Sequence, residues 1–325
     1  MVEEVYKNIW KIEVPLPKSP LKFLNAYVIV GDKKNLLIDT GFNRQECKDA
    51  LSQGLEKIGI SMDNTDIFVT HLHSDHSGLV SDFIKKGRRV YCSKKDALDI
   101  NTLRDFNSWK NKFIGAEKLG FPENLDEYFD RHPGFKFNNT HDIEFSYVED
   151  AEIIQIGEYS LQCIFTPGHT KGIMCLYEKN HRLLFSGDHI LERITPNISV
   201  WSMENNALND YINSLEKIKK LNVDKVFPSH RKLFDHCHRR IDELLDHHRE
   251  RIVEVEEILS KKSLQSPYEI ASQMKWDIKF TNWDDLPHVQ RWFATGEAMA
   301  HLVYLYNLRK ISLSDNKYYE FSNFY

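Results

Sequence analysis

The chain has 325 residues, of which 41% are hydrophobic and 28% are charged, and this balance excludes a disordered or low-complexity protein. The formal net charge of −5 argues against a broad electrostatic surface for nucleic acid. No apolar run is long enough to cross a bilayer, the N-terminus lacks a signal-peptide pattern, and five scattered cysteines are typical of reduced thiols. We therefore expect a cytoplasmic protein that does not enter a membrane.

The first part of the chain predicts strands that are joined by short turns. Residues 9–14 alternate between apolar and polar side chains, and residues 25–30 and 36–38 are rich in Val, Ile and Leu, which indicates a hairpin or meander. Residues 44–58 have apolar side chains at helical spacing, and Gly59 is expected to end that helix. A short buried strand at 66–70 then leads directly to His71.

Between residues 94 and 136 aromatic and charged residues mix at helical spacing, which predicts a helical insertion. Its aromatic residues Trp109, Phe113 and Tyr128 could line the mouth of a substrate site, although such spacing is more typical of a core. Strands resume after the insertion, and a helix at 208–221 precedes a final strand that leads to His230. This mixture of strands and helices predicts a layered α/β domain.

Beyond His230 the pattern becomes helical. Helices are expected at 235–260, after the Ser266-Pro267 start signal, and at 287–308, and a strand–turn–strand closes the chain. This order is similar to that of a winged-helix module. We therefore predict a catalytic domain at 1–232, with its insertion at about 94–136, and a long helix plus winged-helix-like domain at 233–325. The long helix also carries four histidines among charged residues, which we expect on a solvated face: His236, His238, His247 and His248.

Histidine and aspartate side chains gather where predicted strands end. The densest group is His71-Leu-His73-Ser-Asp75-His76, and His169, Asp188 and His230 each follow a further strand. Neutral imidazole and carboxylate are the ligands that zinc and related cations prefer. One such loop alone could be a solvated polar loop, but four strand-end signals in one chain predict a metal centre.

The order of these motifs resembles the metallo-β-lactamase superfamily over roughly residues 9–230. The resemblance implies an αββα four-layer sandwich with a metal pair at one edge of two facing sheets. It implies seven ligands for two divalent cations: His71, His73 and His169 at the first, Asp75, His76 and His230 at the second, and Asp188 at both. Asp39, in the early Asp-x-Gly motif, is implied to position the metal ligands.

Departures from the motifs of individual branches indicate which branches of the superfamily the chain resembles less. Asp188 stands where true β-lactamases of this fold often have cysteine, which disfavours lactam hydrolysis. The complete ligand set disfavours mononuclear iron dioxygenases, and flavodiiron proteins have glutamate in place of His73. The set is similar to that of hydroxyacylglutathione hydrolases and nucleases, but Leu79 replaces a glycine usual in glyoxalase II enzymes, which argues against a glutathione thioester. Residues 274–276 and 290–302 resemble the winged-helix extension of the β-lactamase-like protein two group.

The resemblance implies a hydrolase that uses a hydroxide held by two cations to cleave a small thioester, ester or related acyl bond. Zinc is the expected metal, with iron or manganese as alternatives, and Asp75 is the expected catalytic residue, which orients the nucleophile. A metal-dependent single-strand nuclease or phosphodiesterase and a non-enzymatic winged-helix regulator stay open as alternatives. Basic residues are few near the predicted wing, so a small molecule is favoured over nucleic acid as the partner, and the module is expected to pack or to form a homodimer.

Overall fold

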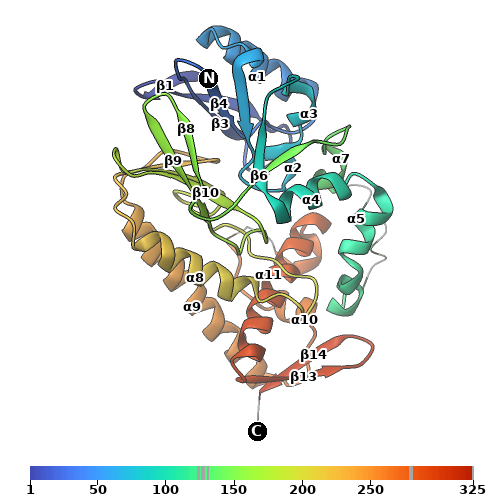
Figure 1. Ribbon diagram of the computed structural model, residues 1–325. Coiled ribbons are helices and arrows are strands. Elements are labelled where there is room, and N and C mark those ends of the chain that lie inside the picture. Colours follow the sequence, from blue (N-terminus) through green and yellow to red (C-terminus); the bar gives the residue numbers. More distant parts are fainter. Residues whose placement is uncertain (123–124, 126–128, 130–131, 278–280, 324–325) are drawn as a thin grey trace.

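Two facing β-sheets form the centre of the fold (Figure 1). The computed structural model describes all residues except 123–124, 126–128, 130–131, 278–280 and 324–325. Among the described residues, the first sheet has seven strands in chain order, and the second has five in the order β12-β11-β10-β9-β8. The first contains β1 (Val2–Tyr6), β2 (Ile9–Pro15), β3 (Phe23–Ile29), β4 (Asn35–Ile38), β5 (Thr65–Phe68), β6 (Val90–Ser93) and β7 (Phe145–Val148). The second contains β8 (Ile153–Ile156), β9 (Tyr159–Phe165), β10 (Met174–Glu178), β11 (Leu183–Gly187) and β12 (Lys225–Pro228).

The strand pairing confirms the meander expected at the N-terminus. Strands β2, β3 and β4 pair antiparallel in sequence order, and β4 then pairs parallel with β5. The chain crosses from β4 to β5 through α1 (Gln45–Ile58) and a short 3-10 turn, η1 (Met62–Asn64). Gly59 ends α1 as predicted, because it adopts a left-handed φ of 78° that favours glycine. Strands β1 and β6 are additional to the predicted elements.

Helices cover the outer face of each sheet, which gives the four layers that the resemblance implied. Apolar side chains of α1, such as Leu51, pack on the outer face of the first sheet. The inner faces of the two sheets meet in a second core that includes Tyr27, Phe185 and Phe227. A third core joins the outer face of the second sheet to α8 (Ala207–Lys219) and α9 (Cys237–Lys261). The fold is therefore the αββα sandwich, with the metal-ligand candidates on the segments that follow its strands, including the short helix α2 (Ser74–Ser77).

The C-terminal elements share this third core. They are α10 (Pro267–Ala271), η3 (Trp283–Asp285), α11 (His288–Asn307) and the hairpin of β13 (Ile311–Asp315) and β14 (Tyr319–Asn323). Figure 1 shows α8 and α9 running together along one side, with α11 central and the hairpin at the far end. Ser266 caps α10 through the predicted start signal. Helices followed by a hairpin match the predicted order, while the winged-helix class and the division at residue 232 stay predictions.

The segment predicted as an insertion is helical over its described residues. It contains α4 (Lys94–Thr102), α5 (Phe106–Lys112), η2 (Ile114–Leu119) and α7 (Pro133–Lys136). Helix α7 lies against α2 (Ser74–Ser77), and α3 (Val80–Phe83) follows α2 in the chain. Trp109 and Phe113 belong to the third core, so packing is their role, and Tyr128 lies outside the described residues.

One expectation about the long helix was wrong. His248 on α9 is fully buried, and its Nδ1 lies 3.2 Å from Nε2 of His301 on α11. The adjacent Arg249 and Glu250 are exposed, whereas Arg251 is buried with His248, so the charged residues in the sequence did not reveal the buried face of the helix. None of the described helices has the length and apolarity that crossing a bilayer requires.

Candidate metal centre

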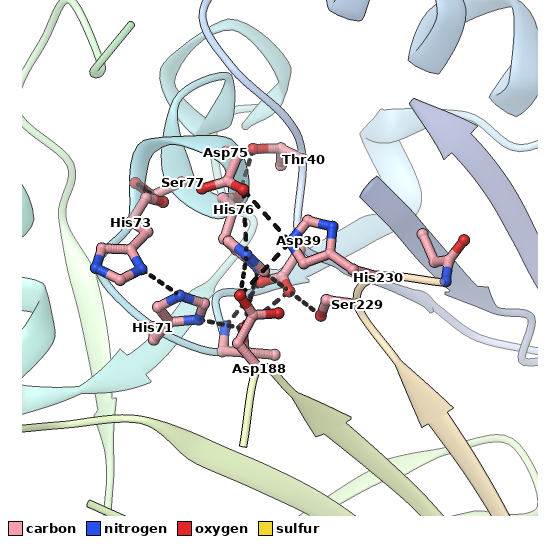
Figure 2. A network of polar contacts seen from close by, with 12 residues as sticks. Asp39, Thr40, His71, His73, Asp75, His76, Ser77, Asp188, Ser229 and His230 are labelled. Carbon is pink, nitrogen blue, oxygen red and sulfur yellow. Dashed lines mark hydrogen bonds and ion pairs between the residues drawn. The ribbon is translucent and has the colours of Figure 1, made fainter. Parts of the chain in front are cut away.

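All seven predicted ligands lie at one edge of the two sheets. His71 follows β5, and Asp188 and His230 follow β11 and β12. Because β4 and β5 are parallel, as are β11 and β12, the carboxyl ends of each pair lie at the same edge of their sheet. Figure 2 shows the side chains of the labelled histidines and aspartates converging from these separate loops.

Three imidazoles form the first group of donors. His71 Nε2 lies 3.0 Å from His73 Nδ1, which lies 3.1 Å from His169 Nε2. The donor atoms of these three residues all lie within 4.8 Å of one another, a spacing at which one cation could contact all three. His71 and His73 come from one loop, and His169 comes from the loop after β9.

The second group combines two imidazoles and two carboxylates. Asp75 Oδ2 lies 3.4 Å from His230 Nε2 and 3.7 Å from His76 Nε2. Asp188 Oδ2 lies 3.5 Å from both of these nitrogens and 3.7 Å from His169 Nε2 of the first group. One oxygen of Asp188 therefore lies between the two groups.

The spacing and the bonding of these atoms fit divalent cations. Ligands at about 2.1 Å from a tetrahedral zinc ion lie about 3.4 Å from one another, which is close to the observed spacing. His76 Nε2, His230 Nε2 and Asp188 Oδ1 are buried, and among the described residues none has a hydrogen-bond partner. Buried polar atoms without partners are costly, and a coordinated cation would satisfy them.

The opposite nitrogens of the histidine rings are occupied. His169 Nδ1 donates to the carbonyl oxygen of Asn197 at 2.8 Å, and His230 Nδ1 donates to that of Phe23 at 2.9 Å. His76 Nδ1 donates to Asp39 Oδ2 at 2.8 Å. Because a carbonyl or carboxylate oxygen only accepts, each ring carries a proton on Nδ1 and directs Nε2 into the site, where a cation would take the place of any proton on Nε2.

Asp39, which the resemblance implied to position the metal ligands, lies beside the site and contacts several of its residues. Its carboxylate accepts hydrogen bonds from the amide and hydroxyl of Thr70, from His76 and from Ser229. The Thr70 hydroxyl donates to Asp39, so it accepts from His71 Nδ1 at 3.1 Å. Asp39 adopts φ of 60°, a left-handed conformation that aspartate tolerates better than most residues. One buried carboxylate therefore links loops from both sheets.

The two donor groups differ in the pKa values of their residues. Burial, together with neighbouring imidazoles, lowers the pKa of His71 and of His73, the latter to about 3, so both are neutral as metal binding requires. Burial raises the pKa of Asp75, but His76 and His230 outweigh it and lower the value to about 2. Burial lowers the pKa of His230, but Asp188 and then Asp75 outweigh it and raise the value to about 10. The second group thus holds charge that the first group does not.

Asp96 is a supporting residue that the sequence did not single out. It is buried at the start of α4, and its Oδ2 accepts hydrogen bonds from the amide of Leu72 at 3.0 Å and the hydroxyl of Thr170 at 2.6 Å. Leu72 lies between His71 and His73, and Thr170 follows His169. One oxygen therefore ties together the two loops of the first group. The Ser93-x-x-Asp96 spacing signals a helix start but not this contact.

Gly168 sets the position of the His169 loop. Its φ of 144° is one that side chains rarely adopt, and a Cβ atom there would lie 2.5 Å from Cβ of Tyr211 on α8. The close approach of backbone to helix fixes the residue before His169.

Comparison with known proteins agrees with the geometry. The chain is 26% identical over 258 residues to a beta-lactamase-like protein 2 homolog of Caenorhabditis elegans, spanning 79% of this chain and 72% of that protein. It is 25% identical over 219 residues to the bovine acyl-coenzyme A thioesterase MBLAC2, spanning 63% of this chain and 72% of that protein. A crystal structure of a metallo-beta-lactamase family protein from Thermus thermophilus has the same fold, with a TM-score of 0.81 and 22% identity over 99% of this chain and all of the other. The sequence model of the metallo-beta-lactamase superfamily matches residues 20–230, and the chain belongs to that superfamily.

Proposed function

We propose that the protein is a dinuclear metal-dependent hydrolase that cleaves a small thioester, ester or related acyl bond. The observation that carries the proposal is the position of Asp188 Oδ2, within 3.7 Å of donors from both groups. A carboxylate shared in this way is suited to two neighbouring cations rather than to one.

Each cation has a defined set of proposed ligands. His71, His73 and His169 hold the first, Asp75, His76 and His230 hold the second, and Asp188 contacts both. Zinc is the proposed metal, because imidazole and carboxylate suit it, with iron or manganese as alternatives. Such cations supply Lewis-acid chemistry, which polarises a carbonyl oxygen and lowers the pKa of water.

Asp75 is the proposed catalytic residue. Its side chain retains 12% of its exposed area, whereas those of His76 and His230 are fully buried. Of these three side chains, only the Asp75 carboxylate is therefore accessible to solvent. We propose that Asp75 accepts a hydrogen bond from the attacking water, orients it toward the carbonyl carbon and passes its proton to the leaving group.

The acyl class is supported by the names of relatives. Three MBLAC2 proteins, from cattle, chicken and human, are acyl-coenzyme A thioesterases at 24–26% identity. At this distance a shared reaction type is a stronger inference than a shared substrate. We therefore propose hydrolysis of an acyl bond, with thioesters as the first substrates to test.

The nuclease alternative receives less support from the described surface. Arg291 is buried, and Lys310 pairs with Glu256 at 3.1 Å, so neither presents a free charge to a phosphate backbone. Phosphate binding requires several such charges on one face. A nuclease would bind single-stranded RNA with an affinity that falls steeply with salt, which a titration at two salt concentrations measures. The cytoplasmic location and the homodimer stay predictions, the latter testable by light scattering.

The test of the proposed function combines metal analysis with a substrate panel. Elemental analysis of the purified full chain is expected to give about two metal ions per chain. Turnover of an acyl-coenzyme A, a simple ester and a phosphodiester is then compared between the wild type and Asp75→Ala. We expect acyl turnover that falls by roughly two orders of magnitude or more in the variant. A folded protein without bound metal, or a variant with wild-type turnover, contradicts the proposal.

A further inference from the structure

The loop that orients His169 has no regular structure of its own. His169 Nδ1 donates to the carbonyl oxygen of Asn197, which lies in the connection between β11 and α8. This connection, residues 191–206, is described throughout and contains no helix or strand. Its position therefore depends on what it packs against.

The 191–206 connection forms several hydrogen bonds with the C-terminal helices. Arg240 on α9 donates to the carbonyl oxygens of Leu191 and Ile194 at 2.8 and 3.2 Å. The Val200 amide donates to the carbonyl oxygen of Gly296 on α11 at 3.1 Å. These contacts bind the connection to elements that lie beyond the matched superfamily region, residues 20–230.

Aromatic packing brings α11 and the connection into close contact. Trp201 stacks on Trp292 of α11, with ring centroids 3.9 Å apart. A Cβ atom at Gly296 would lie 2.7 Å from the Trp201 ring and 2.9 Å from Cβ of Ser199. Only a residue without a side chain allows this approach.

One polar contact from α11 reaches the side chain of Asn197. Asn197 Nδ2 donates to Oε2 of Glu297 on α11 at 3.1 Å, and the Ser199 hydroxyl donates to Asn197 Oδ1. Glu297 is only 9% exposed. A buried carboxyl group is costly, and its Oε2 is directed at the amide of the residue that orients His169.

We infer that Glu297 is a positioning residue of the metal centre: it holds Asn197 in place, and the Asn197 carbonyl oxygen orients the imidazole of His169. The inference rests on the proposed function, since it requires a cation at His169. The C-terminal helices are then part of the metal centre, although they supply none of the proposed ligands. Residues that orient metal-bound histidines influence metal affinity about 10–100-fold in other proteins.

The test measures zinc retention by the full-length protein. The wild type, Glu297→Ala, Glu297→Gln and Asn197→Ala are loaded with zinc and exposed to a chelator, and zinc release is followed with time. We expect Glu297→Ala and Asn197→Ala to release one of the two ions about ten-fold faster and to retain the other normally. Glu297→Gln is expected to stay within about two-fold of the wild type, because its amide oxygen also accepts from Asn197.

A control separates positioning from loss of stability. Glu269→Ala removes the carboxylate that accepts from the Ser266 amide in the capping box of α10, in the same C-terminal region, without touching the 191–206 connection. It is expected to lower the melting temperature but to release both ions at the wild-type rate. The double variant Asn197→Ala/Glu297→Ala is expected to release zinc no faster than either single variant, since both remove one contact.

The measurements distinguish failure of the proposed function from failure of the inference about Glu297. If the wild type retains no zinc or other metal, the proposed function fails and the inference with it. If the wild type retains two ions and both Glu297→Ala and Asn197→Ala retain them equally well, only the inference fails. It also fails if Glu269→Ala releases zinc as fast as Glu297→Ala. Should Glu297→Ala not fold, Asn197→Ala alone decides.

Discussion

Asp96 Oδ2 accepts a hydrogen bond from the hydroxyl of Thr170 at 2.6 Å, and this contact joins helix α4 to the loop that carries His169. The same oxygen accepts the Leu72 amide, so a single carboxylate holds both loops of the first donor group. A buried acceptor shared between two loops fixes their relative position at the cost of its own desolvation. Burial outweighs the hydrogen bond from Thr170 and raises the pKa of Asp96 to about 6.

Asp96→Ala is therefore expected to weaken metal binding at the first group without removing a proposed ligand. We expect about a ten-fold loss in zinc affinity, measured by competition with a chromophoric chelator. Asp99→Asn is the matched control, since Asp99 lies on the same helix and pairs with Lys112 at the surface. Equal affinities for Asp96→Ala and the wild type would show that the loops hold without this carboxylate.

Asp39→Ala is expected to be among the most destabilising substitutions in the chain. The change leaves Thr70, His76 and Ser229 without their shared buried acceptor and places alanine at a left-handed φ. Removing one partner of a buried charged network costs roughly 3–5 kcal/mol. Urea denaturation of the metal-free protein measures the change. A loss under about 1 kcal/mol would contradict the expectation, because it would equal the loss of one ordinary hydrogen bond.

Metal removal is expected to lower stability by mass action. A cation that binds only the folded chain contributes about 3–4 kcal/mol at 100 to 1,000 times its dissociation constant. For a chain of this size the melting temperature is expected to fall by roughly 10 °C on chelation. Scanning calorimetry with and without chelator measures the shift. His230→Ala is expected to show a smaller shift, and a wild type that melts at one temperature in both conditions would refute stabilisation by metal.

The stability of the protein is expected to depend on the ionisation of Glu297. Burial raises the pKa of Glu297 to about 7, against the opposing effects of Arg251 and Asn197. Since the folded chain holds this proton to a higher pH than the unfolded chain, the contribution is present below about pH 4.5 and is lost as the pH rises to 7. The neighbouring His301 and His248 have lowered pKa values and stay neutral in this range.

Comparison with Glu297→Gln isolates this effect. The variant is expected to gain stability relative to the wild type as the pH rises from 4.5 to 7, by up to about 3 kcal/mol. Denaturation of both proteins in their metal-free forms across this range gives the difference directly. Parallel pH profiles would mean that Glu297 ionises in the folded chain as it does in the unfolded one.

Local sequence was sufficient to predict most of the strands, with β1 and β6 as exceptions, and to predict that the proposed donors lie at strand ends. The apolar pattern of the strand before His71 and the Gly-His and Gly-Asp turns are properties of a few adjacent residues, and each predicted donor lies at the edge of the sheets where it was expected. Gly59 and Ser266 act locally too, since a helix end depends on the conformation and hydrogen bonds of neighbouring residues.

Contacts between distant segments required the tertiary structure. Nothing near His248 in the sequence indicates that it meets His301, and Asp96 and Glu297 reach the metal centre only through Thr170 and Asn197. Side-chain periodicity identifies which residues face inward, but it carries no information about which buried face meets which. The sequence alone thus predicted the fold class and the residues proposed as donors, whereas packing of the C-terminal helices against the 191–206 connection decided how those residues are held.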